Sequence, residues 1–343
     1  CMRLRILPKE EIPRMVQALQ SAYRVVGPAA KGPQFAFEEI DDPEELRLDY
    51  NISILSPKVF LQPPEERIAK IHLGEEPEAE EVIESEPTVI FGAHTCDLRA
   101  IQLLDEVFSM DHPDAHYLKR REETLIISLE CLEPCDEHSF CKDMGTLTAE
   151  EGYDLHLTDL GEVYAVDVGT EKGKELLEQY TQAREATDED VRKLNEVLGA
   201  KWPRFSYRLD FEAGELPSLL ATAYEHPLWV ELGDRCLACG SCTNVCPTCY
   251  CFNVTDTVSL DQSEATRTRK WDSCQLDEFA RVAGGENFRE ARAARQRHRF
   301  FRKGKWIYEK TDILGCVGCG RCIRTCLVHI NIVDGFNAIH SSR

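Results

Sequence analysis

Eight cysteines of this chain occur as two copies of one pattern, C-x2-C-x2-C-x3-C. The first copy consists of Cys236, Cys239, Cys242 and Cys246. The second copy consists of Cys316, Cys319, Cys322 and Cys326. Proline 247 follows the first copy, whereas Leu327 follows the second. This spacing is typical of [4Fe–4S] ligation, in which each iron takes one thiolate. The two copies therefore predict two [4Fe–4S] clusters.

The fourth cysteine of each copy is expected to cross over to the other cluster. Three closely spaced cysteines can wrap one cluster, while the fourth lies one helical turn further along and points away from that loop. The predicted ligands of the first cluster are Cys236, Cys239, Cys242 and Cys326. Those of the second cluster are Cys316, Cys319, Cys322 and Cys246. Zinc ribbons are the structural alternative, but they use paired CxxC elements rather than a four-cysteine ladder.

A less regular group of cysteines lies in the first half of the chain. It consists of Cys96, Cys131, Cys135 and Cys141. The first two each follow an apolar run that predicts a buried strand, and ligands collect at the carboxyl ends of parallel strands. If the two strands are parallel neighbours, the thiols converge, and a third [4Fe–4S] cluster is the prediction. His94 and His138 are possible substitute ligands. Scattered buried thiols and a zinc site are the alternatives.

Four further cysteines have no place in these groups. Cys1 is interpreted as incidental. Cys249, Cys251 and Cys274 either ligate something jointly or are small buried groups that shield a cluster from water.

The elements around the first-half cysteines predict a mixed α/β region. A short strand and an amphipathic helix open the chain, and a buried strand over Thr88–Phe91 leads through a glycine-containing turn into a helix that begins near Asp97. A second buried strand, Thr124–Leu129, runs directly into Cys131. The segment that follows alternates like a hairpin with its turn at 159–161, and helical sequence comes after it. The acidic segment Glu75–Pro87 is predicted to be a solvated loop.

The predicted fold class is α+β with two domains. Residues 1–214 form a mixed α/β domain with the third iron–sulfur site. Residues 215–343 form a mainly α-helical, ferredoxin-type domain that holds two clusters, because a long, charged and helical insert separates the two motifs. This domain contains the one basic segment, Phe288–Trp306. Three roles are open for it: a solvated helix face, a docking surface for an acidic partner subunit, or positive charge near a redox centre.

Composition excludes several classes of function. Acidic residues exceed basic ones by 61 − 40 = 21, so nucleic acid is not an expected partner. Sixteen cysteines without a secretory signal favour metal ligation in the reducing cytoplasm over disulfides. No apolar run has the length of a membrane span. No GxGxxG or Walker loop is present, so we expect neither FAD nor NAD on this chain.

The chain resembles the iron–sulfur beta subunits of cytoplasmic [NiFe] hydrogenases (sulfhydrogenases) and the related A subunits of anaerobic sulfite reductases. The resemblance rests on residues 91–108, 120–145, 236–252, 269–290 and 315–326, which contain the sequences CPTCYCF and WDSC. In the middle segment the family tends to read CFC, but this chain has Ser139 there and a cysteine at 135 instead. The sequence therefore leaves open whether Cys135 is a ligand of the third cluster.

The resemblance implies a non-catalytic, electron-transfer subunit of an anaerobic oxidoreductase. Such a subunit relays electrons between a flavoprotein that handles NAD(P) and a catalytic [NiFe] subunit. An electron-transfer subunit of a sulfite or sulfur reductase, or of a heterodisulfide-reductase-type complex, is the alternative. A transcriptional iron–sulfur sensor would need a basic recognition helix, and a free-standing flavoenzyme a nucleotide fold; neither is visible in the sequence.

Overall fold

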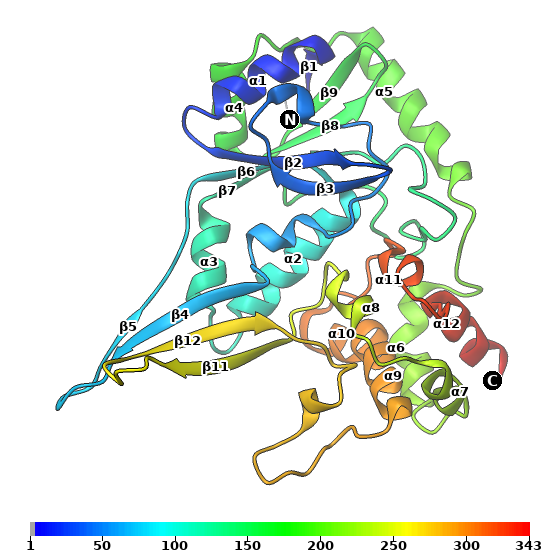
Figure 1. The fold of residues 1–343 in the computed structure, drawn as a ribbon. Helices are drawn as coiled ribbons and strands as arrows, with labels where there is room; N and C mark the ends of the chain where they lie inside the picture. Colours follow the sequence, from blue (N-terminus) through cyan, green and yellow to red (C-terminus); the bar gives the residue numbers. More distant parts are fainter. Residues whose placement is uncertain (1–3) are drawn as a thin grey trace.

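The described part of the chain, residues 4–343 of this computed structural model, contains two β-sheets (Figure 1). The larger is mixed, with the strand order β10-β1-β9-β8-β7-β6-β2-β3. Its strands are β1 (Arg5–Pro8), β2 (Arg24–Lys31), β3 (Gln34–Glu39), β6 (Thr88–His94), β7 (Thr124–Leu129), β8 (Leu155–Asp159), β9 (Val163–Val168) and β10 (Arg184–Glu185). The smaller is antiparallel, with the order β11-β12-β4-β5. Its strands are β4 (Glu65–His72), β5 (Glu78–Glu81), β11 (Phe252–Val258) and β12 (Glu264–Trp271).

Four parallel strands form the centre of the large sheet. Strand β2 pairs with β6, β6 with β7, and β7 with β8, all in parallel. Strands β6 and β7 are buried along their whole length. That burial fits their nearly continuous apolar sequence, since a central parallel strand is covered on both faces.

Helices cover both faces of this sheet (Figure 1). The helices of the first half are α1 (Ile12–Leu19), α2 (Thr95–Ser109), α3 (Ala115–Glu122), α4 (Glu171–Tyr180) and α5 (Asp188–Lys201). Helices α1 and α4 contact each other on one face, and α2 and α3 on the other. The apolar face of α1 is buried through Met15, Val16 and Leu19, and this packing gives the first hydrophobic core.

Several of the predicted elements are confirmed. The opening strand and helix are β1 and α1, and the predicted hairpin is the antiparallel pair β8–β9. One boundary was wrong. Strand β6 continues past Phe91 to His94, and Gly92, with φ of 87°, lies at a register shift inside the strand rather than in a turn. A Cβ at this position would come within 2.8 Å of Leu48, so the bulge requires glycine.

The predicted acidic loop at 75–87 was also wrong, because it contains strand β5. This strand is fully exposed and pairs with β4, where Lys70 faces Glu80 across the two strands. Opposite charges on facing residues stabilise an antiparallel pair, so an acidic segment is tolerated beside a partner that carries lysine. The small sheet extends away from the rest of the molecule as a long arm (Figure 1).

The second half of the chain, predicted to be mainly helical, contains short helices and a β-hairpin. Its helices are α6 (Leu216–Ala221), α7 (Leu228–Arg235), α8 (Ser241–Asn244), α9 (Arg292–Phe301), the π-helix η7 (Arg302–Trp306), α10 (Tyr308–Thr311), α11 (Arg321–Arg324) and α12 (Ile332–Ser341). They pack around a second core that includes Leu216, Trp229, Phe300 and Phe336. The hairpin β11–β12 was not expected, and it pairs with β4 from the first half. The domain division at residue 214 stays a prediction.

Among residues 4–343, no helix combines the length and the apolar character needed to cross a bilayer.

Candidate metal centres

The first cavity among the helices of the second half is lined by four thiols. They are Cys236, Cys239, Cys242 and Cys326, the set that the spacing assigned to the first cluster. Cys236 directly follows α7, and Cys326 lies just beyond α11. The two motifs therefore meet around one cavity, as the crossed pattern requires. Cys239 is the exposed member of the set.

The backbone around this cavity turns sharply and directs N–H groups at sulfur. Ala238 and Gly240 have φ of 53° and 77°, in the left-handed region. The Ala238 N–H donates to Cys236 Sγ at 3.3 Å, and the Ile330 N–H donates to Cys326 Sγ at 3.2 Å. Hydrogen bonds of this kind stabilise negative charge on sulfur and tune a cluster's potential.

The second cavity is lined by Cys246, Cys316, Cys319 and Cys322, the set predicted for the second cluster. Cys242 also lines this cavity, so the two cavities share a wall. Pro247 lies beside Cys246 and helps to close the second cavity.

Two buried cations of the basic segment face these thiols. Arg299, on α9, lines both cavities, and Lys303, on η7, lines the second. Burial opposes their charge, but the neighbouring sulfurs outweigh it and raise the pKa of both groups. Among the described residues, neither cation has a carboxylate partner within 4 Å, although Lys303 Nζ donates to Thr248 Oγ1 at 2.6 Å.

Buried cations of this kind fit a negatively charged group held by the thiols. A buried charge is costly unless it is paired, and a [4Fe–4S] cluster with four thiolates carries net negative charge. The donor set of each cavity and its cations are therefore suited to such a cluster. Of the three roles open for the basic segment, a solvated helix face does not hold for Arg299 and Lys303.

The third group of cysteines is also brought together. Cys96, Cys131 and Cys141 belong to one buried cluster, and Cys135 packs against it. The parallel pairing of β6 and β7 is the cause, because Cys96 lies two residues beyond β6 and Cys131 two residues beyond β7. Cys319, from the second cavity, belongs to the same cluster. The third group therefore adjoins the second cavity.

Cys135 occupies the space near Ser139, the position where the resembling family tends to have a thiol. Burial raises the pKa of the Cys135 thiol, and the neighbouring Ser139 side chain opposes this rise. Ser139 also donates to Asp136 Oδ1 at 3.3 Å. Cys135 and Ser139 are therefore neighbours in the structure.

The two histidines considered as substitute ligands differ in their surroundings. The His94 ring stacks on Tyr50 with centroids 4.1 Å apart, and its Nδ1 lies 3.9 Å from Cys135 Sγ. Burial lowers the pKa of His94 to about 4, so it is neutral at pH 7. The His138 side chain lies 3.8 Å from Glu137 near the surface, and it contributes to the site through its backbone, which packs on Gly320.

Close packing joins the second cavity to the third group. Gly318 and Gly320 have φ of 71° and 74°, and a Cβ on either would approach the 138–141 backbone to 2.6–2.7 Å. The Phe140 N–H donates to the Gly318 carbonyl at 2.8 Å. The buried guanidinium of Arg321 binds both carboxylate oxygens of Asp97, at 2.6 and 2.7 Å.

Sequence reasoning missed several polar neighbours of the thiols. Asp97 was interpreted only as a helix-start carboxylate, and its pairing with Arg321 was not foreseen. Two buried amides, Gln275 and Gln296, also lie beside the first cavity, and Gln296 Nε2 donates to Cys236 Sγ at 2.9 Å. Gln296, Arg299 and Lys303 recur at helical spacing, and that pattern was the available signal.

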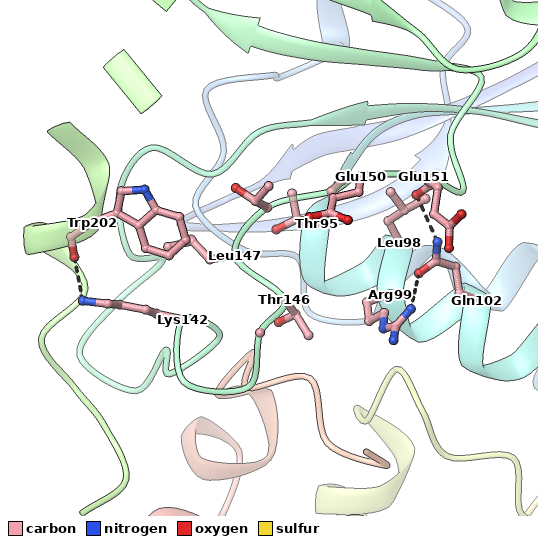
Figure 2. Close-up of a pocket in the computed structure, with 13 residues that line it drawn as sticks. Thr95, Leu98, Arg99, Gln102, Lys142, Thr146, Leu147, Glu150, Glu151 and Trp202 are labelled. Carbon is pink, nitrogen blue, oxygen red and sulfur yellow. Dashed lines mark hydrogen bonds between the residues drawn. The ribbon is translucent and has the colours of Figure 1, made fainter. Parts of the chain in front are cut away.

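A separate pocket of about 400 Å³ adjoins the third group (Figure 2). Thr95 lines it, and the Thr95 hydroxyl donates to Cys131 Sγ at 3.7 Å. Figure 2 shows that its cations have partners: Arg99 donates to Gln102 Oε1 at 3.0 Å, and Lys142 to the Trp202 carbonyl at 3.0 Å. No cysteine of residues 4–343 lines this pocket.

The described cysteines are free thiols. Within residues 4–343, no three His, Cys, Asp or Glu side chains converge closely enough to hold a single metal ion. The thiols instead surround cavities. A [4Fe–4S] cluster has four irons and each thiolate binds a different one, so its ligands need not converge on a single point. Cys1 lies outside the described residues.

Comparisons with known proteins agree with this arrangement. A family model described as a 4Fe-4S dicluster domain matches residues 235–330, which contain both motifs. The chain is 36% identical over 337 residues to sulfhydrogenase 2 subunit beta of Pyrococcus furiosus, covering 97% of this chain and 98% of the relative. No solved structure matches. The chain is therefore an iron–sulfur protein with a 4Fe–4S dicluster domain, and it belongs to the family of sulfhydrogenase beta subunits.

Proposed function

We propose that this chain is the electron-transfer subunit of a [NiFe] hydrogenase complex of the sulfhydrogenase type. In this role it relays single electrons between a flavoprotein subunit that handles NAD(P) and the catalytic subunit. The chain itself is non-catalytic, binds no FAD or NAD, and works in the cytoplasm, where thiols stay reduced and available as ligands.

The contiguity of the three thiol groups is the observation that carries this proposal. The first two cavities share Cys242 and Arg299, and the third group shares Cys319 with the second cavity. The groups therefore follow one another as a row. A row of redox centres at close spacing is what one-electron transfer through a protein needs.

The two ends of this row are open to partners. At one end Cys239 is exposed, and Leu237 and Leu327 beside it are among the exposed apolar side chains. At the other end, Cys131 and Cys135 line a cavity whose rim carries Asp49 and Glu133. One end is apolar and the other is acidic, so each end can bind a different subunit.

Three [4Fe–4S] clusters, when bound, would each accept and release one electron. The proposed ligands are the eight motif cysteines in the crossed arrangement, and Cys96, Cys131, Cys135 and Cys141 for the third cluster. The residues around them set the electrostatics: Arg299 and Lys303 supply positive charge, and the Ala238 and Ile330 N–H groups donate to sulfur. These contacts favour the reduced, more negative state.

Anaerobic purification of the complex through a tag on this chain tests the proposal. We expect a flavoprotein and a [NiFe] catalytic chain to co-purify, and the complex to reduce NAD(P)+ with H2. Replacing Cys322 with alanine should abolish that reaction but leave H2 oxidation with an artificial dye intact. Co-purification with a sulfite reductase chain would show that the catalytic partner is a sulfite reductase rather than a [NiFe] hydrogenase. Reduction of NAD(P)+ by this chain alone would show that the chain is itself catalytic and overturn the relay role.

A further inference from the structure

Cys251 and Cys274 form a thiol pair outside the three groups. They flank the base of the β11–β12 hairpin, where Phe252 faces Trp271 across the two strands. The Asp272 N–H donates to the Cys251 carbonyl at 3.0 Å, which extends the pairing to Cys251 and leaves Cys274 two residues beyond its partner. Cys274 is buried and Cys251 is half-buried.

The two thiols are neighbours, and each is the largest single influence on the pKa of the other. This interaction, helped by the positive charges of Arg302 and Lys303 and opposed by burial, lowers the pKa of Cys251 to about 6. A thiolate beside a second thiol is the arrangement from which a disulfide forms on oxidation.

Two buried amides connect this pair to the first cavity. Gln275 Nε2 donates to Cys274 Sγ at 3.4 Å, and Gln296 Nε2 donates to Gln275 Oε1 at 2.8 Å. Gln296 Nε2 also donates to Cys236 Sγ at 2.9 Å. A continuous path of hydrogen bonds therefore runs from Cys274 to a proposed ligand of the first cluster.

Cys249 differs from this pair. Its thiol contacts Cys246, a proposed ligand of the second cluster, and the carbonyl of Cys249 accepts from Lys58 Nζ at 2.6 Å. Among residues 4–343 it makes no hydrogen bond to Gln275 or Gln296, whereas Cys274 accepts a hydrogen bond from Gln275 and neighbours Cys251. Cys249 therefore serves as the matched control among the unassigned thiols.

We propose that Cys251 and Cys274 form a reversible disulfide that exchanges two electrons with the clusters. This inference rests on the proposed function, since it requires clusters in the first two cavities. In the reducing direction the S–S bond breaks, two reduced clusters each supply one electron, and solvent supplies one proton, so that the Cys251 thiolate and the Cys274 thiol result. In the oxidising direction the bond re-forms, two oxidised clusters each take up one electron, and one proton returns to solvent. The reduced pair therefore stores two electrons that clusters, each carrying one electron, deliver separately.

The test uses the full, cluster-loaded chain under anaerobic conditions. Samples are poised at a series of potentials with redox mediators, denatured in acid and alkylated with iodoacetamide, and the peptides are identified by mass spectrometry. We expect both thiols to be alkylated at low potential and linked by a disulfide at high potential, with a two-electron dependence. Coulometric reduction should take up about two more electrons per chain than in Cys251→Ser or Cys274→Ser, because one disulfide accepts two.

The controls distinguish a redox-active disulfide from a pair of cluster ligands. Both serine variants should keep the iron content of the wild type, and Cys249→Ser should keep the iron, the disulfide and the electron count. Loss of iron from Cys251→Ser or Cys274→Ser would overturn the disulfide in favour of cluster ligation. If the chain contains iron but both thiols are alkylated at every potential, the disulfide proposal is wrong and the proposed electron-transfer function stands. A wild-type chain that binds no iron would overturn the proposed function and the exchange together.

Discussion

Arg321 and Asp97 form a bidentate ion pair in which both side chains are almost completely buried, with exposed fractions of 1% and 0%. Arg321 lies between Cys319 and Cys322, and Asp97 follows Cys96 in the sequence. The pair therefore connects the second cavity to the third group of thiols. Arg321 also donates from Nε to the Ser53 carbonyl at 3.0 Å, so the guanidinium is satisfied on both sides.

Replacing Asp97 with asparagine should destabilise the protein strongly. The Arg321 charge would stay buried without its partner, and breaking one side of a buried pair costs about 3–5 kcal/mol. Anaerobic guanidinium denaturation, followed by tryptophan fluorescence, measures the change. Glu84→Gln is the matched control, because the Arg67–Glu84 pair at 3.2 Å is exposed and such pairs contribute about 0–1 kcal/mol. Equal effects of the two variants would contradict this assignment.

Replacing Cys246 with alanine should damage the cluster of the second cavity. Cys246 follows the first motif in sequence but lines the cavity with Cys316, Cys319 and Cys322. Electron paramagnetic resonance of the dithionite-reduced protein, with each cluster's signal assigned from a Cys239 or Cys319 variant, distinguishes the two clusters. Selective loss of the first cluster's signal in Cys246→Ala would instead show that each motif ligates its own cluster.

Iron and sulfide quantitation tests the third group. With three [4Fe–4S] clusters the anaerobically purified chain should contain about twelve irons, and Cys131→Ala should lower this to about eight. About eight irons in the wild type would reject the third cluster. Cys135→Ser tests its own ligand role: iron loss equal to that of Cys131→Ala supports it, and full iron retention contradicts it.

Neutralising Arg299 should make the potentials of the first two clusters more negative. Arg299 lines both cavities, and removing a unit charge from this position, at an effective dielectric constant of about 20, changes the energy by roughly 1–2 kcal/mol. That equals a shift of about 50–100 mV per electron. Redox titration of Arg299→Gln measures it. The control is Arg297→Gln, on the same helix, whose guanidinium lies over the Tyr224 ring at 3.9 Å. Unchanged potentials in Arg299→Gln would rule out tuning by this charge.

Replacing Gly320 with alanine should disturb the second and third sites together. The backbone has φ of 74°, and a Cβ would lie 2.7 Å from the His138 carbonyl oxygen. We expect lower iron content and a lower melting temperature. In the control Gly199→Ala, the new Cβ meets nothing within 4 Å and lies in helix α5, where alanine is favoured by about 1 kcal/mol over glycine. Iron content equal to the wild type in Gly320→Ala would show that the contact is not needed.

The local features of this protein were predictable from the sequence. Each motif places four cysteines within a short span, so its spacing is visible directly in the sequence. The apolar strands before Cys96 and Cys131 predicted where those thiols would meet, because parallel neighbouring strands end at one edge of a sheet. The hairpin β8–β9 was readable from alternation and a turn, which are equally local signals.

Contacts between distant segments were not predictable in the same way. The Asp97–Arg321 pair and the pairing of β4 with β12 depend on tertiary packing that no local pattern encodes. Strand β5 was hidden by its acidic composition, since its partner rather than its own sequence stabilises it. The inward orientation of Arg299 was hidden for a different reason: a basic helix segment ordinarily faces solvent, and only the charge of the enclosed thiols reverses this.

The arm described above also constrains the order in which the protein can fold. Glu66 on β4 and Arg269 on β12 are hydrogen-bonded at 2.8 Å across a separation of 203 residues. Closing so long a loop is slow, because its entropic cost precedes the contacts that offset it. During synthesis, β4 and β5 emerge long before β11 and β12 exist, and the thiols of the second motif emerge later still. The first two cavities are therefore complete only after Cys326 has been synthesised, so the proposed clusters would be assembled late in synthesis or after it.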